Sequence, residues 1–162
     1  MSFISKLAFE RYYTHIIIPN QHRIKSFYSS NLFVIDLIFT SSSIVSKFHR
    51  LETLILKNLE SKYLGKILKY LTLLPHLFSL TIALVDCKSN KTTLYRQTFS
   101  LPVLKYCKLS YEECAEPESL LLIINKYITI EHMAIKNSFE FYELDALLTY
   151  VPQLRRFCGV IH

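Results

Sequence analysis

The chain has 162 residues, enough for one domain with a continuous apolar core. Hydrophobic residues make up 51% of it and charged residues only 20%, which argues against an intrinsically disordered protein. Lys and Arg outnumber Asp and Glu by 19 to 13, and the two glycines, Gly65 and Gly159, are too far apart to form a glycine-rich phosphate-binding loop.

The first segment, residues 1–23, is predicted to be an N-terminal helical cap or the remnant of a further domain. Residues 1–18 should form one amphipathic helix whose apolar face carries Leu7, Phe9, Tyr12 and Tyr13. This segment lacks the apolar core and cleavage site of a signal peptide, so we expect an intracellular protein, cytoplasmic or nuclear, with reduced thiols. The most apolar window, residues 71–85, is too short to cross a bilayer, and we expect no membrane partner.

From residue 24 onwards one pattern, apolar-x-x-apolar-x-apolar, occurs six times. The copies start at residues 24, 51, 77, 104, 130 and 154, so successive starts are 27, 26, 27, 26 and 24 residues apart. The alternation at the end of each copy is typical of a half-buried strand. A fixed period of this length is typical of a solenoid, and the repeat domain is predicted to span residues 24–162.

The segments between these strands carry helical patterns. In residues 61–71 the side chains of Leu64, Ile67, Leu68 and Leu71 lie on one helical face, with Ser61 as N-cap or first-turn residue. Further helices are predicted over residues 118–126, 140–151 and 31–47, the last with a serine-rich end at Ser41–Ser43. A short helix or a turn is predicted near residues 94–99. A proline stands two residues before three of the strand patterns and ends the preceding helix, at Pro75, Pro102 and Pro152.

A strand followed by a helix and a return, repeated several times, predicts parallel strands with all helices on one side. One residue from each copy should then stand in a single row across the sheet, including Leu54, Leu80, Cys107 and Met133. Because helices are wider than strands, we expect a curved α/β assembly with the sheet on the concave face and the helices on the convex face. Each unit is stabilised by its neighbours.

The copies at residues 51–56 (LETLIL) and 77–82 (LFSLTI) resemble the leucine-rich repeat signature LxxLxL. The resemblance implies a right-handed solenoid of about five to six repeats, as is usual for stacked repeat units. The L-P-x-L sequences that begin at Leu74 and Leu101 are similar to those of divergent F-box/leucine-rich-repeat proteins, which implies a substrate receptor of a ubiquitin ligase. Only 23 residues precede Ile24, and they contain no F-box. A Skp-type adaptor is therefore expected as a partner only if an F-box is supplied.

The resemblance implies that a partner binds the concave sheet, through side chains at positions three, five and seven of each copy. These positions hold cationic groups and tyrosines and no carboxylate, which favours a protein or peptide partner, especially an acidic one. The predicted partner-binding residues are Tyr28, Thr53, Ile55, Lys57, Thr81, Tyr106, Lys108, His132, Lys136 and Arg156.

Other interpretations stay open. Residues 1–108 contain 15 basic and 5 acidic side chains, a balance of +10, so a basic nucleic-acid-binding scaffold is an alternative, although no nucleic-acid-binding motif is present. The face can also be a polar sheet surface without a ligand. A chain that stops after its sixth strand is expected to be a fragment, a degenerate gene product without independent function, or part of a dimer. We expect no enzyme activity, catalytic residue, cofactor or metal, since the histidines and cysteines lack metal-ligand spacing.

Overall fold

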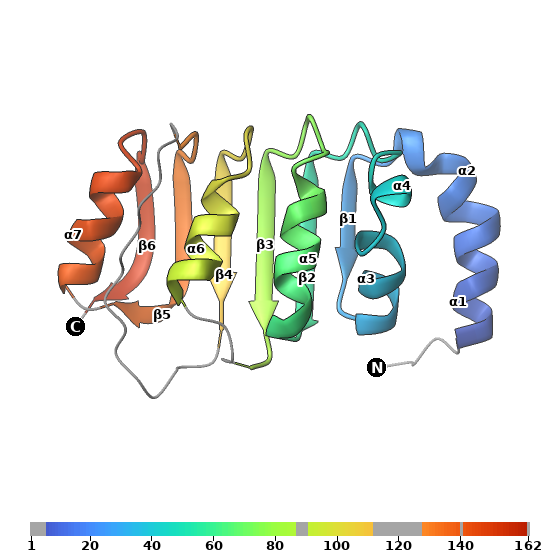
Figure 1. Ribbon diagram of the computed structural model, residues 1–162, viewed down its shortest axis with the longest axis horizontal. Coiled ribbons are helices and arrows are strands. Elements are labelled where there is room, and N and C mark those ends of the chain that lie inside the picture. Colours follow the sequence, from blue (N-terminus) through green and yellow to red (C-terminus); the bar gives the residue numbers. More distant parts are fainter. Residues whose placement is uncertain (1–5, 87–90, 112–127, 140, 162) are drawn as a thin grey trace.

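A parallel sheet of six strands runs through the computed structural model, which describes residues 6–86, 91–111, 128–139 and 141–161. The strands lie side by side in chain order, with the helices on one face of the sheet (Figure 1). The protein is therefore of the α/β class. The strands are β1 (Ser26–Ser29), β2 (Thr53–Leu59), β3 (Ser79–Leu84), β4 (Tyr106–Ser110), β5 (His132–Phe139) and β6 (Arg156–Ile161).

The register of the sheet aligns the six sequence copies. Leu54 pairs with Leu80, Leu80 with Cys107, and Cys107 with Met133, so the predicted single row is confirmed. The row continues to Phe27 on β1 and Phe157 on β6. We call these six residues the inner row; its four central members are at most 2% exposed.

Alternation along the strands separates the two faces of the sheet. In β3 the side chains of Leu80, Ile82 and Leu84 are buried, whereas those between them are half-buried. The first and last copies have no apolar residue at the third apolar position of the pattern, and they fill that space differently. Ser29 is buried and its hydroxyl accepts a hydrogen bond from the Asn31 N–H. A Cβ added at Gly159 would lie 2.7 Å from the Phe157 ring, so that ring occupies the space.

On the helical side of the sheet, α3 (Leu32–Phe39) packs against α5 (Ser61–Leu71), and α5 packs against α6 (Lys91–Phe99) (Figure 1). The helices predicted near 61–71, 94–99 and 140–151 are confirmed, although α6 begins earlier than expected. The segment predicted as one helix over residues 31–47 is helical but not continuous: α3 ends at Phe39, next to the predicted serine-rich end, Ser41 is extended, and a second short helix follows. The helix predicted over residues 118–126 lies outside the described residues. The helices after β1 are α3 (Leu32–Phe39), α4 (Ser42–Val45), α5 (Ser61–Leu71), α6 (Lys91–Phe99) and α7 (Phe141–Tyr150).

The start of α5 is held by the next sequence copy. Ser61 is the first helical residue, and the N-cap residue before it, Glu60, makes no side-chain capping bond. Instead the Ser61 backbone N–H donates to a carboxylate oxygen of Asp86, with 2.7 Å between nitrogen and oxygen. An acid at a helix N-terminus satisfies a free N–H and interacts favourably with the helix dipole. This contact joins two neighbouring copies.

The N-terminal segment is helical throughout its described part, but not as one regular helix. It consists of α1 (Lys6–Tyr12), a π-helical turn η1 (Tyr13–Ile17), α2 (Ile18–Asn20) and a 3₁₀ turn η2 (Gln21–Arg23). On the predicted apolar face Phe9 is buried and Tyr13 half-buried, while Tyr12 is 53% exposed. The π-helical turn shifts the helical phase, and Ile17 becomes the second buried anchor of the segment.

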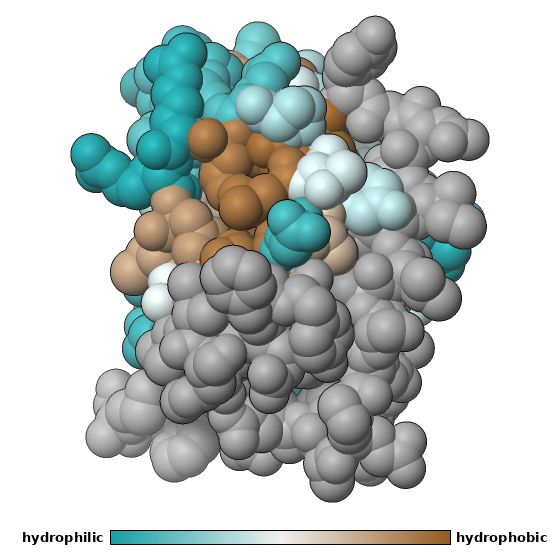
Figure 2. Space-filling view, turned by 90° about the vertical axis from the view of Figure 1, so that its left-hand side faces the viewer, coloured by the Kyte–Doolittle hydropathy of each residue, from teal (hydrophilic) through white to brown (hydrophobic). Residues whose placement is uncertain are grey.

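At the opposite end of the sheet, α7 stands beside β6 (Figure 1). Figure 2 views this end and shows an apolar area over the described residues there. Leu148 of α7 is 45% exposed, while Leu144 and Leu154 are half-buried against the core.

Candidate functional site

The face of the sheet opposite the helices carries two regular rows of side chains, because the register holds from β1 to β6. The first outer row contains Ser26, Thr53, Ser79, Tyr106, His132 and Arg156. The second outer row contains Tyr28, Ile55, Thr81, Lys108, Ala134 and Cys158.

These rows bring together eight of the ten side chains that the sequence predicts to bind a partner. The other two, Lys57 and Lys136, are exposed further along β2 and β5, next to irregularities in the pairing. The irregularity in β2 occurs at Asn58, whose φ of 55° is left-handed, as is common where a bulge interrupts a strand. We call the two outer rows together with Lys57 and Lys136 the open face.

The open face is cationic and carries two accessible aromatic rings. Tyr28 is 57% exposed and Tyr106 is 37% exposed. The Lys57 ammonium lies 5.4 Å from the centre of the Tyr28 ring, a distance at which a cation is attracted to the ring face. Neither outer row contains a carboxylate. The surface therefore offers donors and positive charge to a partner.

A line of alternating charges borders the open face at the start of the strands. Lys25 pairs with Glu52 at 3.0 Å, and Glu131 contacts Lys105 at 3.1 Å and Arg155 at 3.7 Å. The hydrogen bond from Lys105, with its positive charge, lowers the pKa of the Glu131 carboxyl below its usual value. All five residues occupy position two of a sequence copy. This line was not predicted from the sequence, although its residues recur with the period of the copies, because the predicted binding surface contains only positions three, five and seven.

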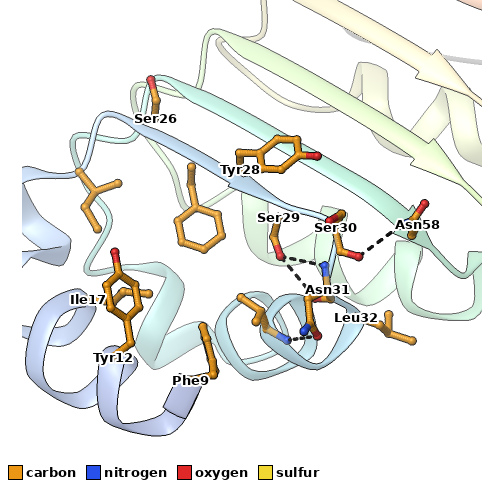
Figure 3. A pocket seen from close by; sticks show the side chains of 13 residues that line it. Phe9, Tyr12, Ile17, Ser26, Tyr28, Ser29, Ser30, Asn31, Leu32 and Asn58 are labelled. Carbon is orange, nitrogen blue, oxygen red and sulfur yellow. Dashed lines mark hydrogen bonds between the residues drawn. The ribbon is translucent and has the colours of Figure 1, made fainter. Parts of the chain in front are cut away.

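A second feature that the sequence did not reveal is a pocket of about 860 Å³ between the N-terminal helices and β1. Phe9, Tyr12 and Ile17 line one side of it, and residues 26–30 line the other (Figure 3). Tyr28 belongs both to this N-terminal pocket and to the open face, so the two surfaces meet at β1. Because the lining comes from distant parts of the chain, no local pattern marks the pocket.

The buried thiol of Cys107 is not a reactive group. It lies in the inner row, and burial raises its pKa to about 12, so the thiolate is scarce near neutral pH. Among the described residues, no three His, Cys, Asp or Glu side chains gather in a way that could hold a metal ion. Nor does the described part of the chain contain a helix that is both long and apolar enough to cross a membrane.

Comparisons with known proteins give no relative from which a function could be transferred. No protein-family model, curated protein or solved structure matches the chain. The open face and the N-terminal pocket are therefore the two features of the described residues that bear on function.

Proposed function

We propose that the chain is a non-enzymatic protein-interaction module of the leucine-rich repeat type, which binds a protein or peptide partner through the open face. The observation that carries the proposal is the continuous register of the six strands. A repeated backbone presents side chains at regular intervals, and repeat proteins use such extended surfaces for binding. In this proposal the stack is a solenoid with the open face on its concave side.

The chemistry of the open face favours an acidic or phosphorylated partner. Lys108 stands in the second outer row and Arg156 and His132 in the first, with no acidic side chain in either row to neutralise them. Hydrogen bonds from cationic donors to carboxylate or phosphate are roughly twice as strong as neutral ones. Tyr106, which pairs with His132 across the sheet, adds a rigid amphipathic contact of a kind enriched at interfaces.

A nucleic acid is less well matched to this surface. Proteins that bind single strands stack bases on exposed aromatic rings. Several rings of this protein instead pack on each other in the core, as Phe27, Phe39 and Phe48 do at centroid distances of 5.4 to 6.3 Å. The remaining rings of the open face, Tyr28 and Tyr106, stand on strands that are not neighbours.

A peptide array tests the proposal. The wild-type protein should select acidic or phosphorylated peptides, and Tyr106→Ala combined with Lys108→Glu should weaken their binding at least about tenfold through loss of charge-assisted contacts. Lys66→Glu is the matched control, because Lys66 is an exposed cation on α5, on the helical side of the sheet. Equal binding by the double variant and the wild type would remove the open face as the binding surface.

The resemblance to F-box/leucine-rich-repeat proteins extends the proposal. In a protein that also carried an F-box, the open face would receive the substrates of a ubiquitin ligase. A fusion of an F-box to this chain should then co-purify with a Skp-type adaptor and retain the peptide selectivity of the isolated chain. A fusion that binds the adaptor but loses the selected peptides would contradict this extension.

A further inference from the structure

The N-terminal pocket runs along the backbone edge of β1. Successive side chains of a strand point to opposite faces of a sheet. The pocket is nevertheless lined by five consecutive residues, 26–30, so it touches the edge between the faces (Figure 3). β1 is the first strand of the sheet, and among the described residues no strand pairs with this edge.

The hydrogen-bonding groups at this edge can be identified. In a parallel ladder, alternate residues of a strand direct their N–H and C=O groups to the same neighbour. The Thr53 N–H donates to the Lys25 carbonyl, at 3.0 Å, so Lys25, Phe27 and Ser29 face β2. Ser26 and Tyr28 therefore direct their backbone groups away from β2, toward the pocket. Beyond the end of β1, the Ser30 carbonyl instead accepts a hydrogen bond from the Asn58 side-chain amide of β2.

The opposite wall is apolar, and one cation, Lys57, stands beside a lining residue. Phe9 and Ile17 present the apolar surface of the N-terminal helices, and Tyr12 stands more than half exposed beside them. The Lys57 ammonium lies over the ring of Tyr28, which lines the pocket. Among the described residues, no acidic side chain lines the pocket. A partner here needs a backbone that can pair with a strand, apolar side chains and negative charge.

We propose that the N-terminal pocket binds an extended acidic–apolar peptide segment of a partner protein, which adds to the edge of β1 as a further strand. Exposed sheet edges bind peptides in this way, with backbone bonds providing affinity and pockets for alternate side chains providing specificity. β1 has four residues, so at about 3.3 Å per residue the added strand would pair over about 13 Å. Alternate apolar side chains would face Phe9 and Ile17, and an acidic residue would face Lys57.

The pocket lies at β1, three strands away from Tyr106 and Lys108 on β4, through which the open face is tested, so the two proposals can fail separately. The probe is an eight-residue peptide of alternating valine and aspartate, titrated into isotopically labelled full-length chain. We expect amide chemical-shift changes at residues 26–30. Two further peptides carry N-methyl groups, one on the odd-numbered residues and the other on the even-numbered residues, so each loses the backbone N–H donors along one of its edges. At least one of the two should bind at least about tenfold more weakly than the unmethylated peptide.

Protein variants locate the same contact. Ser26→Pro removes a backbone N–H that points into the pocket and not toward β2. Because proline is tolerated at sheet edges, the sheet should still form, and peptide binding should weaken about two- to tenfold. Lys66→Glu, an exposed charge reversal on α5 on the helical side of the sheet, is the control and should bind like the wild type. Lys57→Glu should weaken binding of the valine–aspartate peptide and strengthen binding of a peptide of alternating valine and lysine.

Three results would overturn the proposal. The first is an absence of shift changes at residues 26–30 up to millimolar peptide. The second is equal binding of the unmethylated peptide and both methylated peptides, a comparison that needs no protein variant and so does not depend on whether Ser26→Pro folds. The third is chemical-shift changes at residues 26–30 that depend on the protein concentration and not on the peptide concentration. That result would mean that a second copy of the chain occupies the pocket.

Discussion

Replacement of Leu80 by alanine should strongly destabilise the protein, because Leu80 is the inner-row residue of a central strand. It is fully buried between Leu54 and Cys107 on the neighbouring strands. The substitution removes three carbon groups from the core, and at about 0.8 kcal/mol each their transfer to water costs about 2.4 kcal/mol. The cavity left between packed neighbours raises the loss of unfolding free energy to about 3–4 kcal/mol.

Urea denaturation followed by circular dichroism measures this loss. With a slope of about 2 kcal/mol per molar urea, the midpoint of Leu80→Ala should fall by about 1.5–2 M. The matched control is Thr81→Ala, the adjacent residue on the open face, which should cost less than about 1 kcal/mol because it is only half-buried. If Thr81→Ala cost as much as Leu80→Ala, the assignment of the two faces of β3 would be wrong.

Four further predictions concern single side chains. At pH 8 iodoacetamide should modify the exposed Cys158 and leave Cys107 unmodified until denaturant is added, because the buried thiol has a pKa of about 12; peptide mass spectrometry reports both sites. Asp86→Ala should lower the unfolding free energy by about 1 kcal/mol through loss of the α5 cap, as urea denaturation can measure, and Asp86→Asn, which keeps an acceptor, should cost less. The lowered pKa of Glu131 means that its ion pairs stabilise the fold at neutral pH and that this contribution is lost as the pH falls below about 4.5; Glu131→Gln should therefore flatten the acid side of a plot of stability against pH. Thr98→Val should raise the thermal midpoint, since the buried Thr98 hydroxyl has no hydrogen-bond partner among the described residues and an unsatisfied buried group costs about 1–3 kcal/mol; a lowered midpoint would contradict this.

The parallel order and register of the strands were predictable because six copies of one pattern support each other. A polar or small residue in one copy, such as Ser29 or Gly159, does not shift the period fixed by Leu54 and Leu80. The outer rows followed directly from this register and from the alternation of side chains. The sequence therefore located the open face, while its role in binding stays a prediction.

The features that the sequence did not predict depend on contacts outside the period. The carboxylate that caps α5 comes from Asp86, 25 residues later in the chain. The break after α3 coincides with Thr40, whose hydroxyl bonds the Asp36 carbonyl of the preceding turn, and with Ser41, which adopts an extended conformation. Such serine and threonine contacts compete with helix geometry and are not visible as hydrophobic periodicity. The N-terminal pocket likewise depends on how α1 packs against the core.

The central claim is that the sequence copies form adjacent parallel strands in chain order, which creates the open face. Pulsed electron paramagnetic resonance tests it with pairs of spin labels in the first outer row. One label is placed at Ser26 and the other at Ser79, His132 or Arg156, with Cys87, Cys114 and Cys158 replaced by serine. At about 4.8 Å per strand, the backbone separations should rise to about 10, 19 and 24 Å, less any curvature of the sheet. Separations that do not increase in that order would contradict the strand order and the surface built on it.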